Sequence, residues 1–485
     1  MATPYQLVAV HGDVVFAARG SNIHTFTSEL QHISTWKYPA KEENVSSEKT
    51  PAPDASPAPD GPPTKRRKLE AVQKGAPNGN GQAKEAPTPD SKGKKREKIP
   101  DPPPERPFVH GLSVTTDGRH VVAITGSDKT IWVLEHDGSG HLGQLSQRIM
   151  PKRPCAIVIT PDNQNILSAD KFGDVYSLPM IPSPTSEATT PATPSRSATP
   201  SNAQPFKPQA NEFTVHTRRN LKALENQKLG LATQVAKKPT ESQFEHTLLL
   251  GHVSLLTSIL LATHPITKRP YIITGDRDEH IRVSRGHPSQ AHIIENFCQG
   301  HEDFVSRLCI PSSRPELLIS GGGDDHLFTW DWVQGRMLSK TSVLEHVQKV
   351  VPEATKLAVS RLYAFAVSGE VLVLVICERV PAVFCFTLQE NSLHHSATIP
   401  FQGNPLDLAP LNPTPRLLVA LDPTEKSTDD TNVAPLLVVE RDTTGWRVNA
   451  DYRKSMTPKD EVVNSEELGK ILYTTENMRK TADYE

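Results

Sequence analysis

The chain contains a hairpin-like unit that recurs along its length, and this recurrence limits the possible folds more than any other feature. Residues 274–284 (TGDRDEHIRVS) and 320–330 (SGGGDDHLFTW) align without a gap, and residues 168–178 (SADKFGDVYSL) fit the same frame. Residues 125–134 (TGSDKTIWVL) fit with one residue fewer in the turn. Each unit reads as an apolar strand, a turn of small residues and Asp, and an alternating strand, which is typical of a β-hairpin.

A Gly-His pair precedes two of these hairpins, as Gly251-His252 and Gly300-His301, and the second hairpin ends in Trp330-Asp331. A Gly-His start and a Trp-Asp end in units of roughly 40–45 residues are the signature of WD repeats, whose four-stranded blades close into a propeller. The sequence therefore predicts an all-β, WD40-type β-propeller of seven blades, or of six if the last two units are over-divided. The expected blades begin near Tyr5, Pro107, Pro154, His246, Cys298, Lys356 and Leu406.

Two stretches interrupt the strand pattern, residues 40–106 and 181–244. Both are rich in Pro, Ser, Thr, Lys and Glu and poor in large apolar residues, so we expect them to be disordered insertions. The chain then divides into first-blade strands (1–39), a basic, Pro-rich insert (40–106), propeller blades (107–180), a low-complexity insert (181–244), further blades (245–450) and a tail with a short helix (451–485).

The first insert carries two clusters of basic side chains. We interpret them as a nuclear-localisation signal, and the alternatives are an RNA-contacting tail or a merely solubilising segment. The whole chain has a net charge of −2, so it has no strong overall field for nucleic acid. No signal peptide or membrane-spanning run is visible, so we expect a nuclear protein without membrane contact. The signal residues are Lys65, Arg66, Arg67, Lys68, Lys94, Lys95 and Arg96.

The sequence shows no convincing catalytic or metal-binding pattern. Residues 138–143 (GSGHLG) match a glycine-rich dinucleotide motif, but no helical pattern follows, so they are interpreted as a hairpin turn. The five cysteines and the histidines lack zinc-ligand spacing. We therefore expect neither an enzyme nor a metal site; a propeller hydrolase, the enzymatic alternative, would need acids or histidines unique to one blade.

Asp and His residues that recur at equivalent places in different blades are expected to be structural, because a catalytic site is normally unique. In WD blades, the turn Asp and the His of the Gly-His pair commonly form hydrogen bonds within the blade. Asp170 would hold a shifted version of the same place. The expected structural blade residues are His252, His301, Asp278, Asp324, Asp128 and Trp330.

Several motifs together resemble one family. The runs ADKFGDVYSLP (169–179), LLGHVSLLTSI, ITGDRDEHIRVSR, FCQGHEDFVSRLCIP and LYTTENMRK (472–480) resemble the fungal-type non-catalytic WD-repeat subunit of tRNA (guanine-N7-)-methyltransferase. The resemblance covers about residues 108–332 and the tail, whereas the blades from 356 to 449 carry no matching motif. The alternative is a generic WD-repeat scaffold of another nuclear complex, for chromatin or ribosome assembly.

The resemblance implies that this chain forms a heterodimer with a separate catalytic subunit. That partner would bind S-adenosylmethionine and methylate N7 of a guanine in the tRNA variable loop. This chain would bind no cofactor, and its role would be to hold the catalytic subunit in an active shape within a complex that also binds tRNA.

The resemblance places the subunit contact at the basic residue of HIR, Arg282. The aligned hairpins have Trp132, Tyr176 and Phe328 at this position. Ile281 and Val283 would point into the core, so strand alternation puts Arg282 on the opposite face, where a guanidinium at the rim could bind a partner carboxylate.

Three further residues are expected to extend this partner-binding surface. Arg277 stands where the aligned hairpin has Gly323, so the turn itself does not require its charge. His280 lies in the same charged run, and Lys171 lies in the matching turn of the preceding blade.

Overall fold

The computed structural model describes residues 3–39, 107–182, 244–367, 369–411, 415–422, 434–443, 445–449 and 465–480. Most of the two expected insertions and all seven residues of the expected nuclear-localisation signal lie outside the described residues. No helix among those described is long and apolar enough to cross a membrane.

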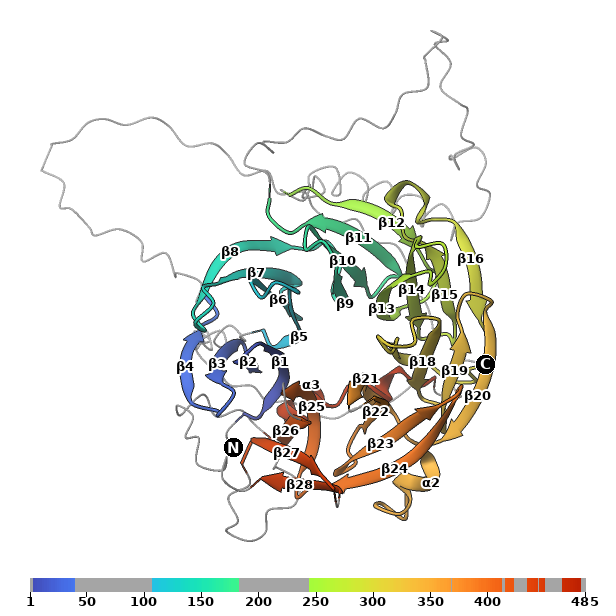
Figure 1. Ribbon diagram of the computed structural model, residues 1–485. Coiled ribbons are helices and arrows are strands. Elements are labelled where there is room, and N and C mark those ends of the chain that lie inside the picture. The colour runs from blue at the N-terminus through green and yellow to red at the C-terminus, as the bar shows by residue number, and fades with distance from the viewer. Residues whose placement is uncertain are drawn as a thin grey trace, which may run out of the picture. The chain divides into compact units, whose positions relative to one another are not determined.

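The described strands form seven antiparallel four-stranded sheets, arranged as blades around a central axis (Figure 1). The seven-bladed WD40-type propeller expected from the sequence is therefore confirmed. Blade 1 contains β1 (Tyr5–His11), β2 (Val14–Arg19), β3 (Asn22–Thr27) and β4 (His32–Trp36). Blade 2 contains β5 (Val109–Val114), β6 (His120–Thr125), β7 (Thr130–His136) and β8 (Leu142–Ile149). Blade 3 contains β9 (Pro154–Ile159), β10 (Asn165–Asp170), β11 (Asp174–Pro179) and β12 (Thr247–Gly251).

The remaining four blades follow in chain order. Blade 4 contains β13 (Leu256–Thr263), β14 (Pro270–Asp276), β15 (Ile281–Arg285) and β16 (Ile294–Cys298). Blade 5 contains β17 (Val305–Cys309), β18 (Leu317–Gly322), β19 (His326–Asp331) and β20 (Arg336–Ser342). Blade 6 contains β21 (Val359–Val367), β22 (Glu370–Cys377), β23 (Ala382–Gln389) and β24 (Ser392–Pro400). Blade 7 contains β25 (Asn404–Leu411), β26 (Arg416–Asp422), β27 (Leu436–Asp442) and β28 (Gly445–Asn449).

Two expected blade starts are wrong. We expected blades to begin at His246 and Cys298, but β12 and β16 close the preceding sheets as their fourth strands. The reason is that the sequence repeat and the structural blade are offset: the Gly-His pair follows an outer strand and leads into the next blade. Blade 3 therefore takes its first three strands from one side of the 181–244 stretch and its fourth from the other.

The register of the second and third strands supports most of the hairpin alignment. Arg282 pairs with Thr274, and Phe328 pairs with Ser320 in the same relation. Trp132 is the exception, because it pairs with Ala123 and donates its Nε1–H to Thr125 Oγ1. That geometry matches Trp330 rather than Arg282, since the blade 2 turn is shorter and shifts the register.

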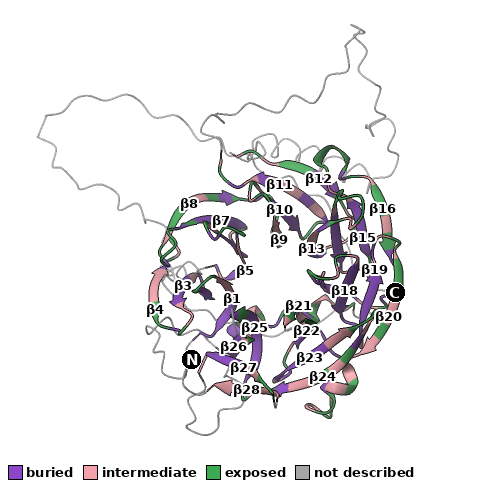
Figure 2. Ribbon diagram, in the orientation of Figure 1, coloured by how far each residue is buried: buried purple, intermediate pink, exposed green. Residues whose placement is uncertain are grey.

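The hydrophobic core lies between neighbouring blades, so both faces of a sheet are buried. On β14, Ile272 packs into the cluster shared with blade 3, and Ile273 packs into the cluster shared with blade 5. Continuous apolar runs such as β22 suit this arrangement, because successive side chains enter different interfaces. Figure 2 shows the consequence: middle strands such as β14 and β18 are largely buried, whereas outer strands such as β16 and β20 expose much of their surface.

Short helical segments complete the described chain. The expected C-terminal helix is present as α3 (Ser465–Leu472), and it is followed by the 3-10 turn η3 (Glu476–Met478). Two other short segments lie between blades or strands, η1 (Pro288–Gln290) and α2 (Leu344–Val347).

Candidate partner-docking surface

Blade 5 contains a buried hydrogen-bond network that fixes the loop before the blade to its central strands. His301 Nδ1 lies 2.6 Å from Asp324 Oδ2, and His301 Nε2 lies 2.7 Å from Ser320 Oγ. Trp330 Nε1 donates to the same hydroxyl at 2.8 Å. Burial favours a neutral Asp324, but hydrogen bonds and charge from His301 and a backbone N–H from Glu302 outweigh it and lower the pKa of Asp324.

Blade 4 has a related network in which Asp276, not the expected Asp278, is the anchor. His252 Nε2 lies 2.9 Å from Thr274 Oγ1, and its Nδ1 lies 3.4 Å from Asp276 Oδ2. Asp276 Oδ1 also accepts the backbone N–H groups of Asp278 and His280. Asp278 points outward instead, toward Lys480. The reason is the turn's own shape: the last carboxylate of β14 folds over the turn and caps its amides, as Asp170 does for Phe172 and Asp174 in blade 3.

Asp128 of blade 2 has a different bond from the one that the repeat pattern predicted. Its carboxylate accepts the hydroxyl of Tyr38 at 3.2 Å. Burial and the charge of Asp128 together raise the pKa of Tyr38 to about 12. In blade 2 this Asp therefore ties the end of blade 1 to the β6–β7 turn.

Arg282 is buried rather than exposed at the rim. Its side chain lies on the strand face opposite Ile281 and Val283, as expected, but that face packs against blade 3 and leaves Arg282 only 7 % exposed. Arg282 Nη1 donates to Gly251 O at 2.9 Å and Nε donates to Ser284 Oγ at 2.9 Å. Because a propeller strand is covered on both faces, a residue opposite the core of one interface enters the next interface.

The β10–β11 turn of blade 3 lies directly against the loop from β12 to β13. A Cβ on Gly173, whose φ is +98°, would lie 2.4 Å from the carbonyl oxygen of His252. Phe172, 54 % exposed, and the fully exposed Val253 therefore belong to two loops that touch. Lys152 places its Nζ 4.1 Å from the centre of the Phe172 ring, which is a cation–π contact.

The β14–β15 turn of blade 4 is tied to the loop that carries Val253 through buried bonds. His252 contacts Asp276, and Asp276 in turn holds the turn that carries His280. The half-exposed His280 ring meets Phe297 of β16 edge-on, with ring centroids 6.4 Å apart, and Phe297 is 39 % exposed. We group these exposed residues of neighbouring loops and strands as the blade 3–4 rim; it comprises Lys152, Lys171, Phe172, Val253, His280 and Phe297.

Exposed large apolar side chains are concentrated on one part of the ring. Among the described residues all ten are carried by blades 2–5 or the loops beside them, and six are on the outer strands β8, β12, β16 and β20. Of the rim residues, Lys171 and His280 were predicted from the sequence, whereas Val253 and Phe297 were not. An apolar residue directly after Gly-His, where the chain leaves the sheet, is the signal that could have identified Val253.

Arg277 and its neighbours face the C-terminal segment. Arg277 Nε donates to the carbonyl oxygen of Met478 at 2.7 Å. Lys480 Nζ lies 3.3 Å from Asp278 Oδ1 and 3.0 Å from Glu279 Oε1. Asp278 and Glu279 are therefore paired within the chain. Among residues 277–280 of this turn, His280 is the one that is exposed.

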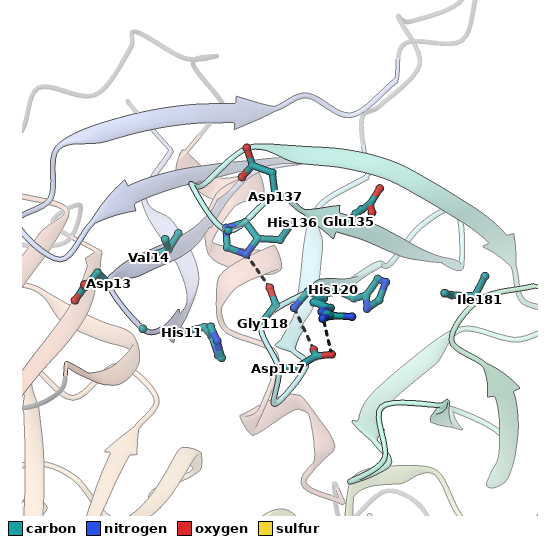
Figure 3. Close-up of a pocket in the computed structure, with 13 residues that line it drawn as sticks. His11, Asp13, Val14, Asp117, Gly118, His120, Glu135, His136, Asp137 and Ile181 are labelled. Atoms are coloured by element: carbon teal, nitrogen blue, oxygen red, sulfur yellow. Dashed lines mark hydrogen bonds and ion pairs between the residues drawn. The ribbon is translucent and has the colours of Figure 1, made fainter.

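A pocket of about 800 Å³ lies at the other end of the strands, between blades 1 and 2 (Figure 3). It is lined by the β1–β2, β5–β6 and β7–β8 turns. His136 braces its wall, because Nδ1 donates to Gly118 O at 2.7 Å and Nε2 accepts the Gly140 N–H at 3.1 Å. Both ring nitrogens of His136 are thus engaged by backbone groups of the chain. Among the described residues, no group of His, Cys, Asp or Glu could hold a metal ion.

Sequence comparisons relate most of the chain to one family. The family model described as "tRNA methyltransferase TRM82 WD40 domain" matches residues 15–437. A protein of Sclerotinia sclerotiorum, named tRNA (guanine-N(7)-)-methyltransferase non-catalytic subunit trm82, is 44 % identical over 85 % of this chain and 83 % of its own. A protein of Coccidioides immitis with the corresponding name is 38 % identical over 96 % of this chain and 92 % of its own.

Structural comparison gives the fold alone. The structure titled "Structure of U3-55K" matches with a TM-score of 0.51 at 12 % sequence identity, covering 90 % of this chain and 95 % of that one. The structure titled "Crystal structure of RRP9 WD40 repeats" matches with a TM-score of 0.50, also at 12 % identity, over 87 % of this chain and 88 % of that one.

Proposed function

Because the chain belongs to the family of WD40-domain, non-catalytic subunits of tRNA (guanine-N7-)-methyltransferase, we propose that it binds and stabilises the catalytic subunit through the blade 3–4 rim. The relatives' name, "non-catalytic subunit", implies a separate catalytic methyltransferase chain. The reaction served by the complex would be N7-methylation of a guanine in the tRNA variable loop.

The observation that carries this proposal is the grouping of exposed apolar side chains on the rim. Phe172 and Val253 are exposed on loops that touch, and Phe297 is exposed beside His280 on blade 4. Aromatic and large apolar side chains surrounded by polar groups form the energetic centre of many protein interfaces. Lys152 and Lys171 supply positive charge beside the apolar residues, which suits a partner surface that combines apolar side chains with carboxylates.

Arg282 contributes to this surface indirectly in our proposal. Its bond to Gly251 O holds the strand end just before the loop that carries Val253, and its strand follows the turn that carries His280. Arg282 would therefore position two rim residues rather than meet the partner itself. Arg277 would act in a similar way, through the C-terminal segment.

We further propose a heterodimer in which the partner binds S-adenosylmethionine and this chain binds no cofactor. The complex would hold tRNA, with the catalytic subunit providing the methyl-transfer site.

The basic clusters at residues 65–68 and 94–96 would direct the chain to the nucleus. A fusion lacking residues 65–98, followed by imaging, tests the last point; unchanged nuclear accumulation would contradict it.

A double substitution at the rim tests the docking proposal. Phe172→Asp with Val253→Asp places two carboxylates in the apolar part of the surface, and we expect at least a tenfold loss of affinity for the co-expressed catalytic subunit, since interface hot-spot residues contribute about 2 kcal/mol or more each. The measurement is calorimetric or pull-down binding, together with N7-methylguanosine formation in tRNA and the melting temperature.

Ile266→Asp is the matched control. Ile266 is an exposed apolar residue of blade 4, but it lies in the β13–β14 turn, at the opposite end of the strands from Val253. We expect this variant to bind and support methylation normally. Equal affinity of the double variant and the control would refute the rim as the docking surface. Purification of the natural complex without any methyltransferase would refute the function and favour a scaffold of another complex.

A further inference from the structure

The C-terminal segment, residues 473–480, crosses four consecutive blades. At blade 7, the buried Tyr473 hydroxyl donates to Asp422 Oδ2 at 2.5 Å and accepts from Asn404 Nδ2 at 3.2 Å. At blade 6, Glu378 accepts the backbone N–H groups of Thr475 and Glu476 at 2.9 and 2.7 Å. Both carboxylates lie at the ends of strands, on the same side of the ring as the β14–β15 turn.

Arg479 fastens the segment to blade 5. Its guanidinium forms an ion pair with Asp303 and donates to the carbonyl oxygens of Gly323 at 3.0 Å and Leu357 at 2.8 Å. It also lies 5.5 Å from the centre of the Phe304 ring. The side chain is only 13 % exposed, so this is a largely buried, multidentate anchor rather than a loose surface pair.

The segment ends on the charged turn of blade 4. Arg277 binds the carbonyl oxygen of Met478, and Lys480 bridges Asp278 and Glu279. Glu279 has a φ of +72°, which is unfavourable for a residue with a side chain. Asp276, Asp278 and Glu279 also place three carboxylates in one turn. Lys480 offsets this repulsion and helps to hold the turn in its strained shape.

We propose that Arg479 is a positioning residue that locks residues 473–480 as a strap across blades 4–7, and that this strap sets the shape of the β14–β15 turn at the edge of the blade 3–4 rim. The first part concerns this chain alone. The second part, that the strap thereby supports binding of the catalytic subunit, rests on the proposed function. The bonds of the turn make the connection, because Arg277 binds the strap while the Asp278 and His280 N–H groups are held by Asp276.

Charge reversal in the full-length chain tests the strap. Arg479→Glu would face Asp303 and two carbonyl oxygens, so we expect the segment to detach while the propeller remains folded. Amide hydrogen exchange should accelerate at least tenfold at Thr475 and Glu476, and also at Asp278 and His280. The double variant Arg479→Glu with Asp303→Arg restores opposite charges and should recover much of the protection at all four amides.

Arg336→Glu provides the control, because it reverses an exposed arginine of the same blade at the β19–β20 turn, away from the strap. Unchanged exchange at residues 475–476 in Arg479→Glu would overturn the strap, and accelerated exchange there with no change at 278 and 280 would overturn its hold on the turn. These results do not depend on the partner.

Affinity for the catalytic subunit tests the second part. We expect Arg479→Glu to weaken binding severalfold and the charge-swapped double variant to restore it. Normal binding despite accelerated exchange at the turn would refute the link between strap and docking. If the unsubstituted chain does not bind the catalytic subunit, the proposed function fails, whereas the exchange experiment still decides whether the strap exists.

Discussion

At the scale of single residues, the role of a carboxylate depends on its place in the turn. Asp276 and Asp278 stand two residues apart, yet the first is buried against His252 and the second faces Lys480. Recurrence in the sequence predicted Asp278 as the structural acid of this run, and this prediction is wrong. The structural acid is Asp276, because the backbone path of the turn differs between blades 4 and 5.

Asp324 makes folding stability depend on pH. Its pKa is lower in the folded chain than in the unfolded one, so its contribution is present above the unfolded value of about 4 and is lost as the pH falls through the folded value. We expect Asp324→Asn to lower the free energy of unfolding by about 1–3 kcal/mol at pH 7, through weaker bonds to His301 and Glu302.

Urea denaturation of Asp324→Asn and the unsubstituted chain across the acid range measures this. The difference between the two proteins should be constant near neutral pH and shrink below about pH 4. A difference that grows on acidification would show that the pKa of Asp324 is raised, contrary to our prediction.

Arg282→Glu separates a structural role from a direct docking role. The substitution would direct a buried carboxylate at the carbonyl oxygens of Gly251 and His292, so we expect a loss of about 3–5 kcal/mol in the free energy of unfolding. The measurement is chemical denaturation alongside partner binding. Unchanged stability combined with lost binding would instead return Arg282 to the interface as a direct contact.

At the scale of elements, the sequence predicted strand type and order well but blade boundaries less well. Gly-His and Trp-Asp landmarks mark repeats, and the closing strand of each sheet precedes its Gly-His pair; β12 and β16 were therefore assigned to the wrong blades. Similarly, Trp132 was aligned with Arg282 in error, because the turn of blade 2 is shorter. These errors share a cause, since strand periodicity carries no information about which neighbouring strands pair.

The residues of the blade 3–4 rim, our proposed docking surface, were only partly predictable for a related reason. Lys171 and His280 were predicted from the charged turns that carry them, whereas Val253, which lies in a loop, and Phe297, which lies on an outer strand, were not predicted. Their exposure follows from the position of their elements at the outside of the ring, which is a tertiary property. The opposite error was made for Arg282, which was expected to be exposed but is buried. Strand alternation predicts the direction of a side chain but not which neighbouring element covers it.

At the scale of the whole molecule, the described strands close the ring without exchange between the first and last blades. Blade 1 comes entirely from the N-terminal strands and blade 7 from β25 to β28. Asp407 on β25 spans the junction: Oδ2 accepts the Val8 N–H of blade 1 at 2.9 Å, and Oδ1 binds Arg361 Nε of blade 6 at 3.0 Å. The Tyr363 hydroxyl also donates to this carboxylate. One buried side chain thus joins three consecutive blades.

Asp407→Ala should therefore weaken the entire ring. The substitution removes the carboxylate that pairs with Arg361 and accepts the Val8 N–H. Losing one partner of a buried ion pair costs about 3–5 kcal/mol. Because the affected bonds join blades, we expect a single unfolding transition shifted to lower denaturant concentration, measured by fluorescence and circular dichroism together.

Asp442→Ala, in the exposed pair with Arg447, is the control and should lower the free energy of unfolding by less than about 1 kcal/mol. Equal stability of the two variants would show that closure depends on apolar packing between β1 and β25 rather than on Asp407.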